Sequence, residues 1–350
     1  MALLRQQSAR GRVSSLLDKS GFIEGVLRMR ARFGSPYMTV LTYHRVFDAP
    51  DDYCFDRGVI DVGPEAFAAQ VKTLKRYFNI VGIDEMCAHL AGEEKLPPNA
   101  AMITFDDGYL DNLHVAAPIL KDNDVRGVFF IATSYVENRR IYWWDRINYL
   151  LCNAKPGRSV VELSYPTRLR LDLENDRESA LQCLLHLMKM QFGLDTERML
   201  DELAEQLGVV WNSDLERELT DGFVMNWDDV RALRAMGMDV QSHTRTHRPL
   251  QTVPLAELSA ELKGSKEDLE RELGEEISAI SYPIGRSIAT LDPIIAAVRD
   301  AGYKVGFTND SGAQPLWGTM NPYDVSRLAM EPEYTGSRFR SVLAVPQLGE

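Results

Sequence analysis

The most constraining feature of the sequence is the run 104–108, Thr-Phe-Asp-Asp-Gly, in which the apolar residues 100–105 end abruptly at two adjacent acidic residues. A short apolar run that ends in acidic residues and glycine is typical of a buried β-strand that delivers carboxylates to the edge of a sheet. In α/β folds ligands bind at that edge, because loops there vary without disturbing the core. Asp-Asp-Gly is also good turn chemistry, so the run alone leaves a plain turn open.

A second motif decides between these interpretations. His243 and His247 lie four residues apart in His-Thr-Arg-Thr-His, directly after 238–242, which also reads as the end of a buried strand. Two imidazoles and one carboxylate form a three-ligand metal site with open positions, and a second carboxylate beside it can accept a proton from water. Glutamate does not follow the first histidine, which argues against a zinc-protease helix. The alternative is a pair of ordinary loop histidines.

Alternating strands and helices predict the fold class. Short strands are expected at 38–44, 79–83, 100–105, 127–132, 238–242, 279–283, 303–307 and 324–329, with helices between most of them. This order predicts a parallel α/β sheet, and about seven repeats favour a closed barrel over an open sheet. The alternation lapses from about 136 to 223, where the patterning predicts a largely helical insertion. We therefore expect one barrel over 37–345 that carries this insertion.

Composition limits the partners and the compartment. The net charge of −12 argues against a nucleic acid partner, because phosphate binding needs a basic face. No apolar run approaches the roughly 18 residues of a membrane-spanning helix. Cys54, Cys87, Cys152 and Cys183 are scattered without metal-type spacing. This pattern predicts reduced thiols in a cytoplasmic protein and no disulfide.

Residues 1–36 form a separate basic segment. The first 34 residues hold seven basic and two acidic side chains, and these charges interrupt any continuous apolar core, so no secretory signal is predicted. Apolar positions fall on a helical stripe at Val13, Leu16, Leu17, Ile23, Val26 and Leu27. Such a helix can lie on an anionic membrane, which would place the protein at the inner face. It can equally pack on the barrel or across a homo-oligomer interface.

The paired runs 104–108 and 243–247 resemble the motifs of the polysaccharide deacetylases, the NodB-homology group or carbohydrate esterase family 4. The resemblance covers about residues 37–330, interrupted by the insertion. It implies a distorted (β/α)7-type barrel that hydrolyses acetyl groups, above all N-acetyl groups, from a sugar of a bacterial polysaccharide, glycan or precursor.

The same resemblance implies a role for each motif residue. Asp106 would be the general base, while Asp107, His243 and His247 would bind a divalent metal. The ligand types favour Zn²⁺, and Co²⁺, Ni²⁺ and Mn²⁺ fit similar sites. The acetylated sugar would be the substrate.

The run 280–285, Ile-Ser-Tyr-Pro-Ile-Gly, is similar to the family's next motif, whose backbone amide helps to hold the oxyanion. That amide would belong to Ile284, and Tyr282 would lie beside the substrate. The family's motif begins with an arginine that steadies the base, but Ser281 stands there. Arg286 either substitutes for it or is an ordinary loop arginine.

The family often takes its general acid from a late histidine, but none follows His247. His44, at the end of the first predicted strand, is our candidate for this acid or for a group in the wall of the site. The alternative is a strand-end histidine with structural partners only.

The runs 41–46 and 142–147 resemble the subgroup of this family linked to bacterial exopolysaccharide and glycan biosynthesis. This implies that Trp143 or Trp144 stacks on a sugar face while Asp145 binds a hydroxyl or approaches the metal. Core aromatics are the alternative. Two other functions stay open: a small-molecule amidase on the same barrel, and a glycan-binding protein that has lost its acid.

Overall fold

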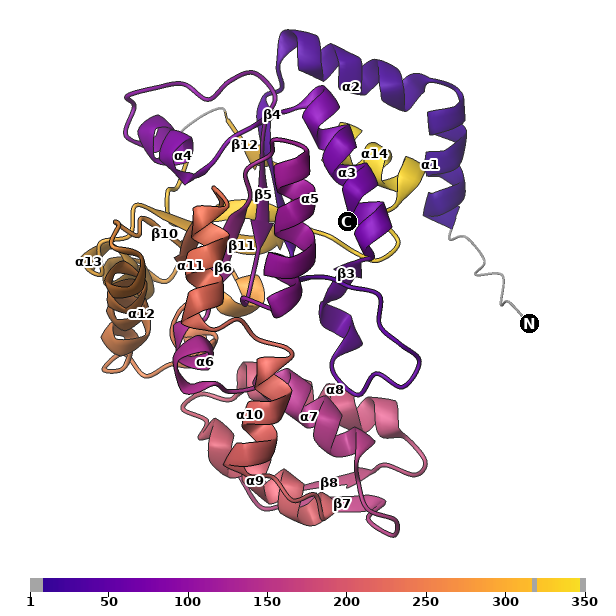
Figure 1. Ribbon diagram of the computed structural model, residues 1–350, viewed down its shortest axis with the longest axis vertical. Coiled ribbons are helices and arrows are strands. Elements are labelled where there is room, and N and C mark those ends of the chain that lie inside the picture. The colour runs from indigo at the N-terminus through magenta and orange to yellow at the C-terminus, as the bar shows by residue number, and fades with distance from the viewer. Residues whose placement is uncertain (1–8, 317–319, 347–350) are drawn as a thin grey trace.

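Seven parallel strands close into a barrel, as the computed structural model of residues 9–316 and 320–346 shows (Figure 1). The barrel closes because β1 pairs with both β5 and β13, while the other strands link these two in the order β13, β11, β10, β9, β6, β5. The strands are β1 Tyr37–Tyr43, β5 Ala100–Phe105, β6 Val128–Ile131, β9 Asp239–Ser242, β10 Ala279–Ser281, β11 Val305–Ser311 and β13 Val325–Ala329. The predicted (β/α)7-type barrel is confirmed.

Helices cover the outside of the barrel, and the remaining short strands lie at its ends. The covering helices are α3 Pro64–Tyr77, α4 Ile83–Leu90, α5 Ala117–Asp122 (continuing the π-helical turn Asn112–Ala116), α11 Trp227–Ala235, α12 Leu258–Leu273, α13 Asp292–Asp300 and α14 Gly336–Ala344. The short strands are β2 Arg45–Val46, β3 Ile60–Val62, β4 Asn79–Ile80 and β12 Gln314–Pro315. The predicted strand at 79–83 is thus reduced to two residues, because Ile83 already begins α4.

Side-chain alternation along β5 divides the core into two layers. Met102 packs with Phe130 and Phe307 from other barrel strands, whereas Phe105 packs edge-on against Phe67 of α3. Successive side chains of a strand point to opposite faces, so even-numbered positions of β5 face the barrel interior. Asp106 continues this even series and therefore starts at the mouth of the barrel.

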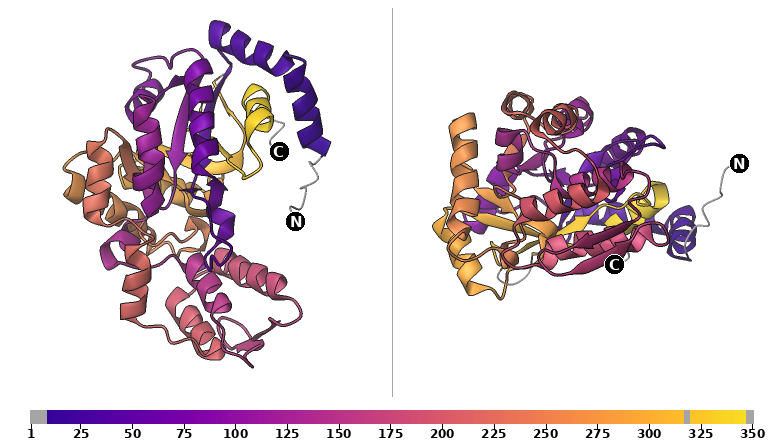
Figure 2. Two further views of the ribbon diagram at one scale, coloured as in Figure 1. Left: turned by 45° about the vertical axis from the view of Figure 1, so that its right-hand side comes forward. Right: turned by 90° about the horizontal axis from the view of Figure 1, so that it is seen from below.

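The N-terminal segment forms two helices, α1 Ala9–Lys19 and α2 Phe22–Phe33, rather than one. They separate at Gly21, whose φ of 77° is in the left-handed region that glycine adopts without strain. Ile23 and Leu27 are fully buried, and α1 and α2 both contact α14 (Figure 2). The Arg30 side chain also bonds to the backbone of α14 and to Asn99.

Between β6 and β9 the chain forms a lobe below the barrel mouth (Figure 1). Its elements are α6 Thr133–Asn138, α7 Trp143–Cys152, β7 Val160–Leu163, β8 Leu169–Asp172, α8 Arg177–Met190, α9 Thr196–Leu207 and α10 Ser213–Asp221. The antiparallel pair β7–β8 was not expected from the sequence. The lobe brings α7 and α8 to the mouth of the barrel.

A disulfide joins Cys54 to Cys152, so the prediction of reduced thiols is wrong for these two residues. Cys54 lies in the loop between β2 and β3, and Cys152 ends α7; 98 residues separate them in sequence, but their Cα atoms are 5.6 Å apart. That long separation hides the pair from an analysis of spacing. Cys87 and Cys183 are free thiols.

None of the helices within residues 9–316 and 320–346 combines the length and the apolar character that crossing a bilayer requires.

Candidate metal centre and active site

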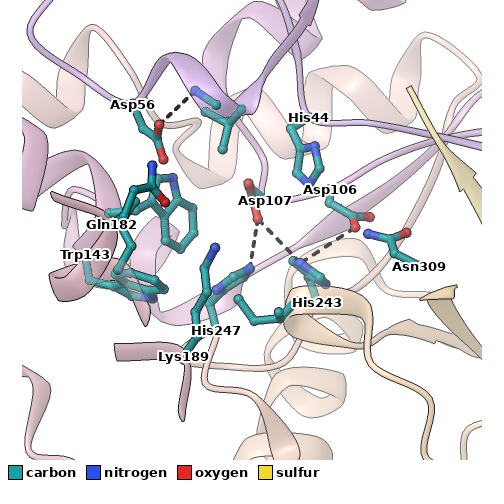
Figure 3. A pocket seen from close by; sticks show the side chains of 15 residues that line it. His44, Asp56, Asp106, Asp107, Trp143, Gln182, Lys189, His243, His247 and Asn309 are labelled. Atoms are coloured by element: carbon teal, nitrogen blue, oxygen red, sulfur yellow. Dashed lines mark hydrogen bonds and ion pairs between the residues drawn. The ribbon is translucent and has the colours of Figure 1, made fainter. Parts of the chain in front are cut away.

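Three buried side chains form a candidate metal site at the carboxyl ends of the strands. Asp107 follows β5, and His243 and His247 follow β9, the second strand along from β5. One ligand atom from each lies within 4.8 Å of the others. The Nε2 atoms of His243 and His247 lie 3.4 and 3.2 Å from Oδ1 of Asp107 (Figure 3). Two imidazoles and a carboxylate suit first-row divalent metals.

The backbone turns these ligands toward one centre. In a continuous strand Asp106 and Asp107 would face opposite ways, but Asp107 has φ of 75°. Thr244 and His247 also have positive φ, at 63° and 54°. Such values are uncommon outside glycine and mark strain that the surrounding structure must hold. The left-handed residue after β5 thus separates the two carboxylates into different positions of one site.

Hydrogen bonding around the ligands fits a metal. The Nδ1 atom of His243 lies 2.9 Å from the carbonyl of Ser281, which accepts its proton and leaves Nε2 free as a ligand. Oδ1 of Asp107 is buried and accepts no hydrogen bond from any residue the structure describes. Burial lowers the pKa of His247 despite its contact with Asp107, which favours the neutral imidazole that metals bind. A metal ion would satisfy this Asp107 oxygen, which lies between two imidazoles and accepts no hydrogen bond.

Asp106 is held by a residue that the sequence analysis did not single out. Arg327 on β13 donates from Nη1 to Oδ1 at 2.8 Å and from Nη2 to Oδ2 at 2.7 Å. Ser281 donates to Oδ2 at 3.2 Å. Burial alone would raise the pKa of Asp106, but the charge and hydrogen bonds of Arg327, together with the charges of His243 and His44, outweigh burial and lower this pKa. The carboxylate is therefore kept ionised, as a general base must be.

Arg286 is not placed to steady the Asp106 carboxylate. Its Nη2 lies 2.7 Å from Sδ of Met190, and it does not line the cavity. Arg327 could have been noticed in the sequence as a lone arginine inside an apolar predicted strand.

His44 directly follows β1 and faces the same cavity (Figure 3). Its Nδ1 lies 3.4 Å from Oδ2 of Asp61, which also accepts its backbone N–H. Burial alone would lower the pKa of His44, but the negative charges of Asp61, Asp107 and Asp106 raise it to about 9. His44 is therefore protonated at neutral pH and can donate a proton.

The site opens into a cavity of about 340 Å³. The sequence-predicted residues that line it are His44, Asp106, Asp107, Trp143, Trp144, His243, His247 and Ile284. Polar residues that line it without having been predicted are Asp56, Gln182, Lys189 and Asn309. Three of these four come from the β2–β3 loop and from α8, where no motif marks them in the sequence.

The aromatic run at the start of α7 lies against the metal site. The ring of Trp144 is 4.5 Å from that of His247, and its Nε1 donates to the hydroxyl of Tyr109 at 2.7 Å. Asp145 is fully buried and does not line the cavity. It accepts hydrogen bonds from Tyr109 at 2.8 Å and from the backbone of Asp56 at 2.9 Å. Burial raises the pKa of Asp145 to about 8. The Asp145 carboxylate therefore contacts other protein groups in this structure and not the cavity.

The motif after β10 places Ile284 at the cavity in an unusual conformation. Ile284 has φ of 65°, a genuine outlier for a β-branched residue. Gly285 after it packs so closely on Asn309 that an added Cβ would lie 2.3 Å from the Cβ of Asn309. Tyr282 does not line the cavity: it is 2 % exposed, and its hydroxyl donates to the carbonyl of Tyr323.

Comparison with known proteins identifies the family. The sequence model of the family described as polysaccharide deacetylase matches residues 93–160 and 198–306, which make up half of the chain. The chain therefore belongs to the polysaccharide deacetylase family, as the sequence analysis predicted. Protein YxkH of Bacillus subtilis (strain 168) is 26% identical over 112 residues, which span 32% of this chain and 38% of YxkH.

Solved structures share the fold. The Streptococcus pyogenes deacetylase PplD, solved with acetate, is 18% identical with a TM-score of 0.57, covering 88% of this chain and 98% of PplD. IcaB from Ammonifex degensii is 18% identical with a TM-score of 0.56, covering 89% of this chain and 99% of IcaB. A de-N-acetylase from Aggregatibacter actinomycetemcomitans is 17% identical with a TM-score of 0.53, covering 87% of this chain and 98% of that enzyme.

Proposed function

We propose that the chain is a metal-dependent hydrolase that removes acetyl groups, in the first place N-acetyl groups, from a sugar of a bacterial polysaccharide, glycan or precursor. Family membership supports the reaction class. The observation that carries the proposal is the placement of Asp106 beside the candidate ligands Asp107, His243 and His247 in one cavity.

The candidate ligand set suits Zn²⁺, with Co²⁺, Ni²⁺ or Mn²⁺ as alternatives. Asp107, His243 and His247 would hold the ion. A divalent metal bound there lowers the pKa of water and polarises a carbonyl oxygen.

Each neighbouring residue then has a separate task. Asp106, kept ionised by Arg327, accepts the proton of the attacking water. The backbone amide of Ile284 donates to the oxygen on which negative charge develops. His44, protonated through Asp61, donates a proton to the leaving amine. Trp143 and Trp144 offer an apolar wall to a sugar face.

The test is acetate release by the purified protein, loaded with Zn²⁺, from N-acetylglucosamine oligomers and from O-acetylated sugars. Asp106→Asn should lower the rate by about 10²–10⁴-fold, the usual contribution of a positioned acid or base. Asp84→Asn, at a carboxylate 90% exposed on α4, is the matched control. Turnover of small cyclic amides alone would favour the amidase, and tight sugar binding without turnover would favour the glycan-binding protein.

We also propose that residues 37–345 act as one catalytic unit, with the segment at about 136–223 as an insertion that completes the cavity. Trp143, Gln182 and Lys189 of this segment line the cavity, which supports that division. A homo-oligomer, which the sequence left open, would be detected as a larger sedimentation coefficient.

A peripheral membrane contact is proposed for the outward face of α2. Phe22, Met29 and Phe33 are 54%, 56% and 78% exposed, although their side chains are large and apolar. Spacings of seven and four residues place them on one side of the helix. Arg28, which pairs with Glu24 at 2.8 Å, and Arg32 flank this side of the helix and would meet anionic lipid. The sequence predicted a cytoplasmic protein, with possible contact at the inner face of the membrane. The cytoplasmic expectation rested partly on reduced thiols, which the Cys54–Cys152 disulfide contradicts.

A further inference from the structure

Three polar side chains from outside the barrel form the wall of the cavity that faces the metal site. Asp56 precedes the short helical turn Arg57–Val59, and Gln182 and Lys189 lie on α8. A spacing of seven residues places Gln182 and Lys189 on one side of the helix. Figure 3 shows Asp56 and Gln182 across the cavity from His44 and Asp106, with the amino group of Lys189 pointing into the space between. We call Asp56, Gln182 and Lys189 the polar wall.

The polar wall has hydrogen-bonding capacity that the protein leaves unused. Lys189 is half-buried, and none of the described residues forms a hydrogen bond or an ion pair with its ammonium group. Gln182 donates to Glu178 at 3.0 Å, which leaves its carbonyl oxygen to accept. Oδ1 of Asp56 accepts from the backbone of Gly58 at 2.8 Å, which leaves Oδ2. Sugar hydroxyls donate and accept, so a wall with an ammonium donor and two oxygen acceptors matches them.

The Asp56 side of the wall is fixed in place. The backbone N–H of Asp56 donates to Oδ1 of Asp145 at 2.9 Å. Two residues earlier, Cys54 is bonded to Cys152 at the end of the same helix that carries Asp145. Groups held in position before binding lose less conformational entropy when the ligand arrives. The segment is therefore suited to recognise a ligand of defined shape.

Charge within the wall is balanced. One carboxylate and one ammonium group of the wall face the cavity. Burial raises the pKa of Asp56, and the backbone N–H of Gly58 and the positive charge of Lys189 reduce that rise. Across the cavity, Asp106 is paired with Arg327 and His44 with Asp61. An acidic substituent near Lys189 would gain its attraction but would also meet repulsion from Asp56. A neutral sugar meets neither this attraction nor this repulsion.

We propose that Asp56, Gln182 and Lys189 bind the hydroxyl groups of a neutral N-acetylhexosamine unit and select it over sugars that carry a carboxylate. This rests on the proposed deacetylase function and adds three residues that bind the sugar and select it by charge. In this proposal Lys189 and Gln182 affect the binding of the sugar, whereas Asp106 affects the rate of hydrolysis.

The first test separates binding from chemistry. We would measure kcat and KM for acetate release from N-acetylglucosamine oligomers by the Zn²⁺-loaded wild type, Lys189→Met and Gln182→Ala. Each loss of a sugar hydrogen bond should raise KM by about 3- to 10-fold with kcat nearly unchanged. Lys121→Met, which removes an exposed ammonium from α5, is the matched control and should leave KM as it is. Unchanged KM in both wall variants would overturn the proposal.

The second test uses charge. Neutral oligomers should be preferred by the wild type over matched oligomers with a C6 carboxylate. Asp56→Asn keeps an acceptor for Gly58 but leaves Lys189 uncompensated, so it should shift the preference toward the acidic oligomers. Lys189→Met should shift it toward partly deacetylated, cationic oligomers. The same shift in both variants, or none, would contradict a charge-balanced wall.

Binding can be followed without turnover through the fluorescence of Trp143 and Trp144, which line the cavity. Suppose that the wild type binds neutral oligomers, that the wall variants bind them more weakly, and that no acetate is released. The polar wall is then supported as a binding site, and the deacetylase function is contradicted. If the wild type releases acetate while the wall variants behave like the wild type, the function stands and the wall fails.

Discussion

Arg327 and Asp106 form a bidentate ion pair that is buried on both sides, with the guanidinium fully enclosed in the barrel and the carboxylate 2% exposed. Two parallel N–H···O bonds fix the orientation of the carboxylate as well as its charge. The arginine also donates to Thr104 and Ser281, so the Asp106 carboxylate is held by a network from three strands. In the proposed mechanism Arg327 would therefore take the part that the family resemblance gives to an arginine at the start of the motif after β10.

Changing Arg327 should reduce catalysis even when the positive charge is kept. Arg327→Lys retains the charge but loses the planar fork, so Asp106 is free to rotate. We expect kcat to fall by about 10- to 100-fold, the equivalent of losing one or two charge-assisted hydrogen bonds. Steady-state acetate release measures it. An unchanged kcat would show that the orientation of Asp106 does not depend on the fork.

Removing the charge should destabilise the fold. Arg327→Met leaves the Asp106 carboxylate buried without its partner, which typically costs about 3–5 kcal/mol. The double variant Arg327→Met/Asp106→Asn should recover part of that loss, because no buried charge remains unpaired. Urea unfolding of the wild type, both single variants and the double variant closes the cycle. Additive losses would show that the pair is not coupled.

The His44–Asp61 pair predicts the alkaline limb of the pH profile. His44 must be protonated to act as an acid, and its pKa is raised to about 9, mainly by Asp61 against the effect of burial. Activity should therefore persist through neutral pH and fall as the pH rises through about 9. Asp61→Asn removes the main stabilising charge and should move this limb to lower pH. If the limb stays in place in Asp61→Asn and in His44→Gln, another group is the acid.

The same shift affects stability with a defined sign. A histidine whose folded pKa lies above its unfolded value near 6.5 stabilises the fold below that value and loses this contribution as the pH rises through about 9. Asp61→Asn should therefore lose more stability at pH 6 than at pH 10. Thermal unfolding at both pH values measures this difference. An equal loss at both would assign Asp61 to packing alone.

Metal loading should be stoichiometric and should stabilise the fold. A ligand that binds only the native state raises Tm by mass action. We expect about one divalent ion per chain by elemental analysis, with loss of both the ion and activity after chelation. His247→Ala should abolish binding. His89→Ala on α4, outside the site, should not. A Tm that does not respond to chelation in the wild type would argue against the three-ligand site.

The sequence predicted those parts of the site that are local. Asp106 with Asp107, and His243 with His247, are each adjacent or nearly so along the chain, and each follows a strand of clear apolar pattern. Since parallel strands present their carboxyl ends at one edge, the two motifs could be expected to meet. The barrel followed from the same alternation of strands and helices.

Long-range partners were not predictable in this way. Arg327 lies 221 residues from Asp106, and Cys54 lies 98 residues from Cys152. Neither spacing carries a signal, because only the closed barrel and the lobe bring these residues together. The resemblance of the run 142–147 implied that Asp145 binds a sugar hydroxyl or approaches the metal, whereas in the structure its carboxylate accepts a hydrogen bond from Tyr109. One sequence lacks the information that fixes such side-chain directions.

The disulfide should contribute to stability and to the order of the β2–β3 loop. The bond closes a loop of 98 residues, for which the chain-entropy estimate is about 4.7 kcal/mol, whereas disulfides typically contribute about 2–4 kcal/mol. We expect Cys54→Ser and reduced wild type to show a similar fall in Tm and a raised KM, because Asp56 lies two residues from Cys54. Cys87→Ser, at a free thiol, is the control. Four reactive thiols in the unfolded, unreduced protein, rather than two, would contradict the bond.

The outward face of α2 predicts binding to anionic membranes. Phe22 and Phe33 are exposed, whereas Ile23 and Leu27 of the same helix are buried against the barrel side, so the exposed rings are not needed for packing. Binding to vesicles that contain phosphatidylglycerol should exceed binding to neutral vesicles and weaken with added salt. Phe22→Ser/Phe33→Ser should reduce it without lowering Tm, while Phe192→Ser, at a ring 61% exposed in the lobe, should not. Equal binding by all three proteins would exclude α2 as the contact.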